Sequence, residues 1–167
     1  MGSVRMAAAA GAVIWAAATA AAATRTTVLP VSATVAAACT VSAAPLAFGA
    51  YTPGAGALRA TTRLRVACAR GTAFRVALGA GSNPGATFAQ RLLENGAASL
   101  QYNLYTNAAR SVIWGDGSAA TRTVARRGRG PARPISIAVY GLLPDNTFNR
   151  SAPAGTYRDT IVVTVTY

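Results

Sequence analysis

The last stretch of the chain, "RDTIVVTVTY", alternates apolar and polar residues with a period of two. One face carries the four apolar residues Ile161, Val163, Val165 and Tyr167. This period is that of a β-strand with one buried face, so we predict a strand over 159–167. The strand needs neighbours on its hydrogen-bonding edges, because an open apolar edge pairs readily with another chain.

A similar alternation occurs near the beginning of the chain, in "TTVLPVSATVAAAC". One face carries the apolar residues Leu29, Val31, Ala33 and Val35. Pro30 lacks the N–H that a sheet ladder needs, so this predicted strand lies at a sheet edge or begins there.

Between these two segments, four further short runs alternate. Their predicted inward residues are Leu58, Ala60, Leu64, Val66 and Cys68, then Phe74, Val76 and Leu78, then Leu100, Tyr102 and Leu104, and finally Ile135, Ile137 and Val139. The arginines at 59, 63, 65 and 75 fall on the outward faces, where solvated side chains are expected. Turn sequences separate the runs, and no long helical period occurs after the first residues. The pattern predicts an all-β sandwich.

The first 23 residues have the features of a secretory signal peptide. Arg5 precedes an acid-free apolar stretch that ends with small residues at Ala21 and Ala23. A membrane anchor is the alternative, but the stretch consists mostly of weakly hydrophobic alanine. We predict cleavage near Ala23, with no stable membrane insertion afterwards.

Export makes the two cysteines, Cys39 and Cys68, candidates for a disulfide, since the compartments outside the cytoplasm are oxidising. A free thiol or a metal site is the alternative. Two cysteines in a chain without histidine do not complete a structural zinc site.

The chain is strongly basic, with 16 arginine residues, no lysine, and 4 acidic residues. A net charge of +12 permits acidic partners, although a coding bias towards arginine is the simpler explanation for most of these residues. The densest stretch, "ARRGRGPAR", contains the candidate polyanion contacts Arg126, Arg127, Arg129 and Arg133. The alternative is an exposed loop. No aromatic residue lies within the stretch to stack on bases, so we expect no nucleic-acid partner.

The sequence offers little for catalysis, and we expect neither an enzyme nor a cofactor or metal site. There is no histidine, and the only carboxylates are Glu94, Asp116, Asp145 and Asp159. Two of them, Asp116 and Asp145, lie in turn sequences, where Asp commonly binds the local backbone. Trp114 could serve as a sugar platform, but a large aromatic residue in a sandwich is more often part of the core.

A series of motifs extends over the chain from Cys39 to Tyr167: "CTV…LAFGAY", "LRVAC", "FRVALGAG", "LQYNLYTNAARSVIWGDG", "AVYGLLP" and "AGTYRDTIVVTVTY". In this order they resemble the spore coat protein U domain family, which includes subunits of archaic chaperone–usher pili. The resemblance implies an incomplete immunoglobulin-like β-sandwich that is completed by a donor strand from another subunit. It also implies a disulfide between the two cysteines, a periplasmic chaperone and an outer-membrane usher as partners.

The resemblance divides the chain into a signal peptide at 1–23, a donor-strand extension at 24–38 and a sandwich domain at 39–167. It implies that the terminal strand faces first the chaperone and then the donor strand of another pilus subunit. The leading hypothesis is therefore a structural subunit of a secreted surface pilus that supports adhesion or biofilm formation. The alternatives are a spore-coat or surface-coat protein outside a pilus, and a secreted polyanion-binding module.

Overall fold

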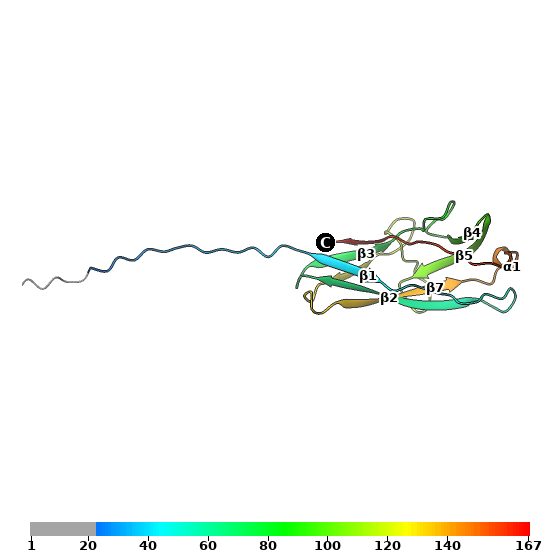
Figure 1. Cartoon of the computed structure of the whole chain (residues 1–167), viewed down its shortest axis with the longest axis horizontal. Helices are drawn as coiled ribbons and strands as arrows, with labels where there is room; N and C mark the ends of the chain where they lie inside the picture. Colours follow the sequence, from blue (N-terminus) through cyan, green and yellow to red (C-terminus); the bar gives the residue numbers. More distant parts are fainter. Residues whose placement is uncertain (1–22) are drawn as a thin grey trace, which may run out of the picture. The chain divides into compact units, whose positions relative to one another are not determined.

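A computed structural model describes residues 23–167, and almost all of the predicted signal peptide lies outside these residues. The chain divides into two units, residues 1–34 and 35–167. Residues 23–34 form no helix or strand, and their side chains are exposed. All strands of the described chain belong to the second unit (Figure 1).

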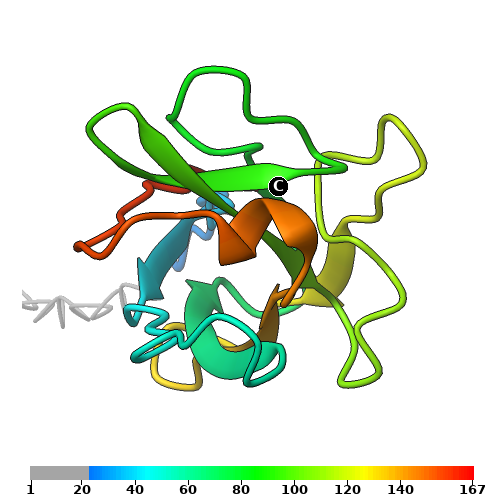
Figure 2. The same ribbon diagram turned by 90° about the vertical axis from the view of Figure 1, so that its right-hand side faces the viewer.

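Eight strands and one short helix make up the second unit. They are β1 (Cys39–Ala43), β2 (Leu58–Cys68), β3 (Ala73–Leu78), β4 (Arg91–Asn95), β5 (Ala98–Tyr105), β6 (Val124–Arg127), β7 (Ile135–Leu143), α1 (Thr147–Arg150) and β8 (Val163–Thr166). The strands form two antiparallel sheets, one in the order β1-β2-β7-β5-β4 and one in the order β6-β3-β8. Figure 2 views them from the end that carries α1.

The core lies between the inward faces of the two sheets, as the alternation predicts. Val66 and Val76 are fully buried, while Arg59 and Arg75 on the opposite faces are exposed. Trp114 is also fully buried, and its indole N–H donates to the carbonyl of Val76 at 3.0 Å. The core interpretation of Trp114 is therefore confirmed, and its ring is not accessible as a sugar platform. The resulting architecture is an immunoglobulin-like β-sandwich.

The predicted disulfide is present and joins the first two strands. Cys39 and Cys68 lie directly opposite each other in the β1–β2 register, with their Cα atoms 4.0 Å apart. Cys68 is buried in the core. The bond therefore ties the edge strand β1 to its neighbour β2 in the five-stranded sheet.

Three strands, β1, β4 and β6, were not predicted from the sequence. The arginine-rich stretch is exposed at Ala125, Arg126 and Arg127 as predicted, but the loop interpretation is wrong for these residues, which belong to β6 and pair with β3. Only Val124 is buried in this short edge strand, so it has no alternating pattern. The strand exists because the backbone of β3 lies beside it, and a local sequence pattern does not contain that information.

Arg91, at the start of β4, is buried among backbone carbonyls. Its guanidinium donates to the carbonyls of Gly79 and Trp114, each at 2.7 Å, and to the side-chain oxygen of Asn103. Burial lowers the pKa of Arg91. Gly79 follows β3 and Trp114 precedes β6, so these bonds connect β4 of one sheet to segments next to the other sheet. No carboxylate takes part in them.

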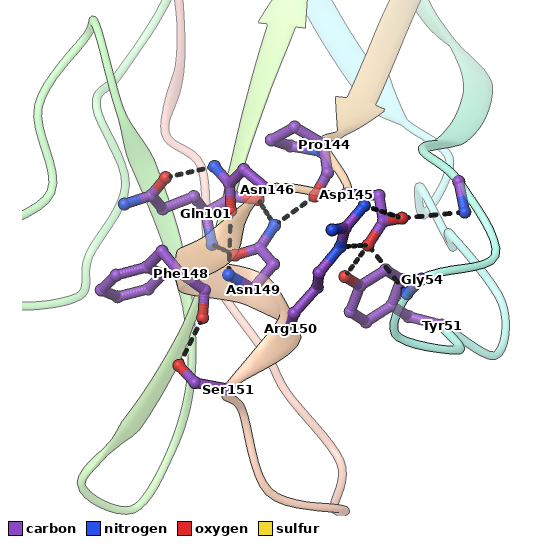
Figure 3. Close-up of polar contacts among 11 residues, drawn as sticks. Tyr51, Gly54, Gln101, Pro144, Asp145, Asn146, Phe148, Asn149, Arg150 and Ser151 are labelled. Atoms are coloured by element: carbon purple, nitrogen blue, oxygen red, sulfur yellow. Dashed lines mark hydrogen bonds and ion pairs between the residues drawn. The ribbon is translucent and has the colours of Figure 1, made fainter.

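Polar side chains also close the end of the sandwich that carries α1 (Figure 3). Asn149 is fully buried, and its amide accepts from the backbone N–H of Gln101 at 2.7 Å and donates to the carbonyls of Gln101 and Pro144. Its side chain thus pairs with the backbone of β5 as a neighbouring strand would. Asn146 caps the helix by accepting from the N–H of Asn149 at 2.8 Å.

Next to this helix, Asp145 holds the loop that precedes β2. Its carboxylate accepts from the Tyr51 hydroxyl at 2.6 Å, from the N–H groups of Gly54 and Gly56, and from Arg150 at 3.0 Å (Figure 3). The turn interpretation therefore understates the role of Asp145, whose partner Tyr51 is 94 residues away. It is confirmed for Asp116, which accepts from the backbone and hydroxyl of Ser118.

Candidate functional site: an open groove between β1 and β8

A groove of about 340 Å³ runs between the edge strands of the two sheets. One wall is the end of β1 and the segment after it, from Ala43 to Phe48, and the other is the segment 159–163 leading into β8. The floor consists of core side chains, including Leu64, Leu78, Leu104 and Val139. The hydrophobic core of the sandwich is therefore accessible along this opening.

Both strands that border the groove have a free hydrogen-bonding edge within the described chain. β1 pairs only with β2, and β8 pairs only with β3. Gly79 N–H donates to the carbonyl of Val162, so residues 162, 164 and 166 bond towards β3. Backbone groups alternate between the two edges of an antiparallel strand, which leaves those of Val163 and Val165 directed away from β3.

The same reasoning applies to β1. Ala44 N–H donates to the carbonyl of Arg63, and Ala38 C=O accepts from Ala69 N–H, so the even-numbered residues bond to β2. The backbone groups of Val41 and Ala43 therefore lie on the free edge. A single extended segment placed between β1 and β8 could bond to both edges and join the two sheets.

Apolar side chains around the groove are only partly covered. Val41 lies opposite Val66 in the register, on the core side of the sheet, yet it remains 41% exposed. Ile161, Val163 and Val165 pack against the core but are also only half-buried. Covering these side chains would stabilise the fold by roughly 25 cal/mol for each Å² of apolar surface removed from water.

The terminal strand is shorter than predicted. The prediction of 159–167 as one strand is wrong for 159–162, because the chain changes sheets there: Arg158 exchanges two backbone hydrogen bonds with Glu94 at the five-stranded sheet, and β8 pairs with β3. Ile161, Val163 and Val165 face inward as predicted. Tyr167 does not, since it lies beyond the end of β8 and its side chain is 59% exposed.

Three groove residues, Phe48, Tyr102 and Asp159, were not identified as site residues from the sequence. Asp159 accepts from the Tyr102 hydroxyl at 2.6 Å and from the N–H of Ser82 at 3.0 Å, which fixes the beginning of one wall. Burial, followed by the hydrogen bond to Asp159, raises the pKa of Tyr102. Phe48 packs edge-on against the Tyr102 ring, with the centroids 5.8 Å apart. Phe48 lies in the motif "LAFGAY", but no local pattern in the sequence places it beside Tyr102.

The predicted donor-strand residues Leu29, Val31, Ala33 and Val35 form no strand in this single chain. Their side chains are exposed, with exposed fractions of 81% for Leu29, 87% for Val31 and 89% for Val35. The chain thus carries an alternating apolar segment that it does not bury. The donor role of these residues stays a prediction.

The four candidate polyanion contacts separate into two pairs. Arg126 and Arg127 lie on β6 and line a hollow on the three-stranded sheet. Arg129 and Arg133 follow β6 and do not line this hollow. Sequence proximity therefore does not correspond to a single arginine site.

The described residues contain no group of three or more His, Cys, Asp or Glu side chains placed to hold a metal ion. Over the same part of the chain, no helix has the length and apolar character needed to cross a membrane. The groove is lined mainly by apolar side chains and its one carboxylate is fully engaged in hydrogen bonds, which suits the binding of a peptide segment.

Comparisons with known proteins agree with this architecture. The chain is 33% identical over 162 residues to Protein U of Myxococcus xanthus, covering 87% of each chain. Its fold is similar, with a TM-score of 0.56 and 23% identity, to a chain in the crystal structure of the CsuC–CsuE chaperone–tip adhesion subunit pre-assembly complex from archaic chaperone-usher Csu pili of Acinetobacter baumannii. That match covers 80% of this chain and 40% of the Csu chain, so the present chain spans less than half of that protein's length.

The model of one protein family matches most of the sequence. It is the Spore Coat Protein U domain, and the match extends over residues 12–164. The disulfide, the groove and the strands β1 to β7 lie within this range, which ends inside β8. The chain belongs to the Spore Coat Protein U domain family.

Proposed function

We propose that the protein is a structural subunit of a secreted surface pilus, assembled by donor-strand exchange. In this mechanism, the alternating segment 29–35 of one subunit enters the groove between β1 and β8 of another subunit. Leu29, Val31, Ala33 and Val35 cover the half-buried groove residues, and the backbone of the segment bonds to both free edges. The observation that carries the proposal is an open groove in a chain that also has an exposed strand-like segment.

The lengths of the two parts are compatible. Seven extended residues, such as 29–35, span about 23 Å, and the groove wall at 159–163 together with the free edge of β8 up to Val165 also comprises seven residues. Each fully buried Leu or Val side chain contributes about 1.5–3 kcal/mol, so the burial of several of them makes the junction between two subunits stable.

The connection between the segment and β1 favours exchange between copies over insertion into the same subunit. Only Ala36, Ala37 and Ala38 separate Val35 from the beginning of β1 at Cys39. Lying beside its own β1 would require the segment to reverse direction within these residues, and none of them is a preferred turn residue. Insertion into a second subunit needs no reversal, and repeated head-to-tail insertion produces an open fibre.

The similarity to a subunit from Csu pili supports a periplasmic chaperone and an outer-membrane usher as partners, since an unassembled groove needs temporary cover. Signal cleavage near Ala23 would release the mature chain into the periplasm before it reaches the cell surface. The assembled fibre would support adhesion or biofilm formation, without catalysis or a cofactor.

A pair of variants tests the donor-strand assignment. Val31→Asp places a carboxylate in an apolar pocket of the groove, at a cost of several kcal/mol, whereas Thr34→Asp places it on the opposite face of the segment. We expect the first variant to abolish donation and the second to have little effect. Gel electrophoresis of surface fibres, with and without boiling, reports assembly as a ladder that collapses on heating.

Mixing Val31→Asp with the wild-type protein separates the donor role of a subunit from its acceptor role. Val31→Asp retains an intact groove, so it should accept a wild-type donor and shorten wild-type fibres when added to them. Equal assembly by Val31→Asp and wild type, or equal damage by Thr34→Asp, would show that another segment completes the groove.

The family description and the similarity to Protein U favour a second candidate, a spore-coat or surface-coat protein outside a pilus. The groove could join subunits in either assembly. Electron microscopy of surface material labelled with an antibody against the chain separates the two candidates, because a pilus gives labelled filaments and a coat gives a labelled layer.

A further inference from the structure

The outward face of β2 carries three arginines on one surface of the five-stranded sheet. Arg59, Arg63 and Arg65 are exposed, while the residues that alternate with them point to the core side. Residues two apart along a strand point to the same face, about 6.8 Å from each other. The neighbouring strand β7 (Figure 1) confirms the assignment, because Arg63 donates at 3.4 Å to the hydroxyl of Ser136, which the register places opposite Arg65.

Arg110 adds a fourth guanidinium group to the same face. It donates to the carbonyl of Gly141 at 2.9 Å and to the carbonyl of Ala60 at 3.5 Å, and its Cζ lies 5.9 Å from the centre of the Tyr140 ring. The register pairs Tyr140 with Thr61, an exposed residue on the outward face of β2. The guanidinium of Arg110 therefore lies at the level of Thr61, in the gap between the first two arginines of β2. We call the four residues together the arginine row.

The position of Arg110 is fixed by its own chain. Its φ of 55° lies in the left-handed region, which residues other than glycine rarely adopt. Three of its five N–H groups donate to backbone carbonyls, the third being that of Ala108, and two are left for a ligand. A coding bias explains how many arginines the chain has, but it does not explain why this one is held beside those of β2.

No carboxylate neutralises the arginine row. Among the described residues, the one ion pair joins Arg150 to Asp145, which lies beyond the end of β7. Glu94 is on β4, and both β5 and β7 separate that strand from β2. The remaining acidic groups lie elsewhere: Asp116 in a turn, Asp159 at the open groove, and the end of the chain at Tyr167 beyond β8, in the other sheet. Four guanidinium groups without a neighbouring acid favour an anionic partner.

The shape of the arginine row selects an extended polymer. From Arg59 to Arg65 the row is about 20 Å long, with one guanidinium group about every 6.8 Å along a straight strand. A linear sugar polymer with a carboxylate on each unit can lie along the strand, and its carboxylates can accept from successive guanidinium groups. A single-stranded nucleic acid needs open aromatic rings for base stacking, whereas the Tyr140 ring is half-buried and has Arg110 over it.

We propose that the arginine row binds an extended acidic polysaccharide, whose carboxylate groups accept from Arg59, Arg110, Arg63 and Arg65. The choice of a polymer found outside the cell rests on the surface location in the proposed function. A fibre would repeat the row once in each subunit, so individually weak contacts would add along one polymer. None of the four residues is among the polyanion contacts predicted from the sequence.

Immobilised polygalacturonate, with neutral dextran as the control polymer, tests the proposal on the full mature chain. We expect the protein to bind polygalacturonate and not dextran, with an affinity that falls as salt screens the charges. Failure to bind polygalacturonate at low salt, or equal binding to both polymers, would overturn the proposal.

Two triple variants separate a site from a general charge effect. The test variant is R59Q/R63Q/R65Q, and the control is R75Q/R126Q/R127Q, which removes the same charge from exposed positions of β3 and β6. We expect about tenfold weaker binding for the test variant, because individual exposed ion pairs are weak, and a much smaller loss for the control. Equal losses in variants with unchanged urea midpoints would show that net charge, and not the row, determines binding.

A rescue experiment tests the part played by Arg110. R110Q should weaken binding about two- to threefold, and the second variant R110Q/T61R returns a guanidinium group to the same level of the row from β2 itself. The second variant should regain the lost affinity even if the loop around residue 110 has moved. Full binding by R110Q, or no recovery in the folded double variant, would contradict the fourth position of the row.

Competition by a single-stranded oligonucleotide tests the class of partner. Soluble polygalacturonate should displace the protein from the immobilised polymer at least as well as the oligonucleotide does, when both are compared at equal concentrations of anionic groups. Displacement by the oligonucleotide at a much lower concentration would overturn the assignment to a polysaccharide.

The outcome is independent of donor-strand exchange. Thr62 and Leu64 line the open groove, whereas the arginines of β2 extend from the opposite face of the strand. R59Q/R63Q/R65Q should therefore still give the heat-sensitive ladder. Polygalacturonate binding without a ladder from the wild-type chain would contradict the proposed function alone. A normal ladder without polygalacturonate binding would contradict the arginine row alone.

Discussion

The groove side and the α1 end of the sandwich differ in whether the chain itself provides hydrogen-bond partners for the backbone. At the α1 end, the amide of Asn149 bonds to the backbone of β5, and Asp145 holds the loop around Gly54. Along the groove, β1 and β8 each have one partner strand, and Val41 remains 41% exposed on the core side of its sheet. The chain closes one region with its own side chains and leaves the other open.

This difference separates folding from assembly. In the closed regions, no buried side-chain nitrogen or oxygen of the described chain lacks a hydrogen-bond partner. Changes there should lower the stability of the single subunit, because they leave buried polar groups unpaired. Changes in the donor segment should spare the subunit and weaken the junction between copies.

Arg91→Ala should have the largest effect on the subunit. It removes the donor to the carbonyls of Gly79 and Trp114 and to Asn103, at an expected cost of about 3–5 kcal/mol in the free energy of unfolding. Arg150→Ala removes an arginine that is 53% exposed and should cost much less, because exposed ion pairs contribute little to stability. Urea unfolding followed by tryptophan fluorescence compares them, and similar costs would contradict a structural role for the buried guanidinium.

Removal of the disulfide should have the next largest effect. The bond closes a loop with a sequence separation of 29 residues. On the chain-entropy model, the double variant C39S/C68S should lose roughly 3–4 kcal/mol of unfolding free energy. The urea midpoint measures the loss. Thiol titration of the native wild-type protein should find no free thiol, and two free thiols per chain would refute the bond.

Leu29→Ala should weaken the junction without destabilising the subunit. If Leu29 is buried in the groove of another copy, its truncation should cost about 2–3 kcal/mol per junction and lower the temperature at which the fibre ladder collapses. Ser32→Ala, on the opposite face of the segment, is the matched control. A lower urea midpoint for the Leu29→Ala subunit itself would place this residue in the fold of its own chain.

The smallest expected effect is the pH dependence of stability that arises from two ionisable residues near the α1 end. Hydrogen bonds from Arg150 and then Tyr51 hold the pKa of Asp145 well below its usual range, so its contribution to stability is present above about pH 4 and is lost as the pH falls further. Burial and the bond to Asp145 raise the pKa of Tyr51 to about 12, so its contribution is lost as the pH rises from about 10 towards that value. Melting temperatures across pH should show both losses, and Asp145→Asn should flatten the acidic one. An unchanged acid profile in Asp145→Asn would rule out this carboxylate as its source.

Local periodicity was sufficient to predict the central strands and the inward positions of β8. Leu64, Val66 and Phe74 face the core because a period of two directs alternate side chains to one face. It also identified the apolar face of 29–35, although an alternating pattern does not say which chain covers it. The two cysteines could be paired from the sequence because the chain contains no others.

Tertiary structure decided which backbone each strand borders, and local patterns do not encode that choice. β6 forms because β3 lies beside it, and the chain after Arg158 leaves the edge of β4 to pair with β3, which shortens β8. The same pairing places Arg75 and Arg127 on one face of the three-stranded sheet and Arg126 on the other. The sequence determined the faces of the strands through side-chain alternation. Only long-range backbone pairing determined the edges, and through them the open groove.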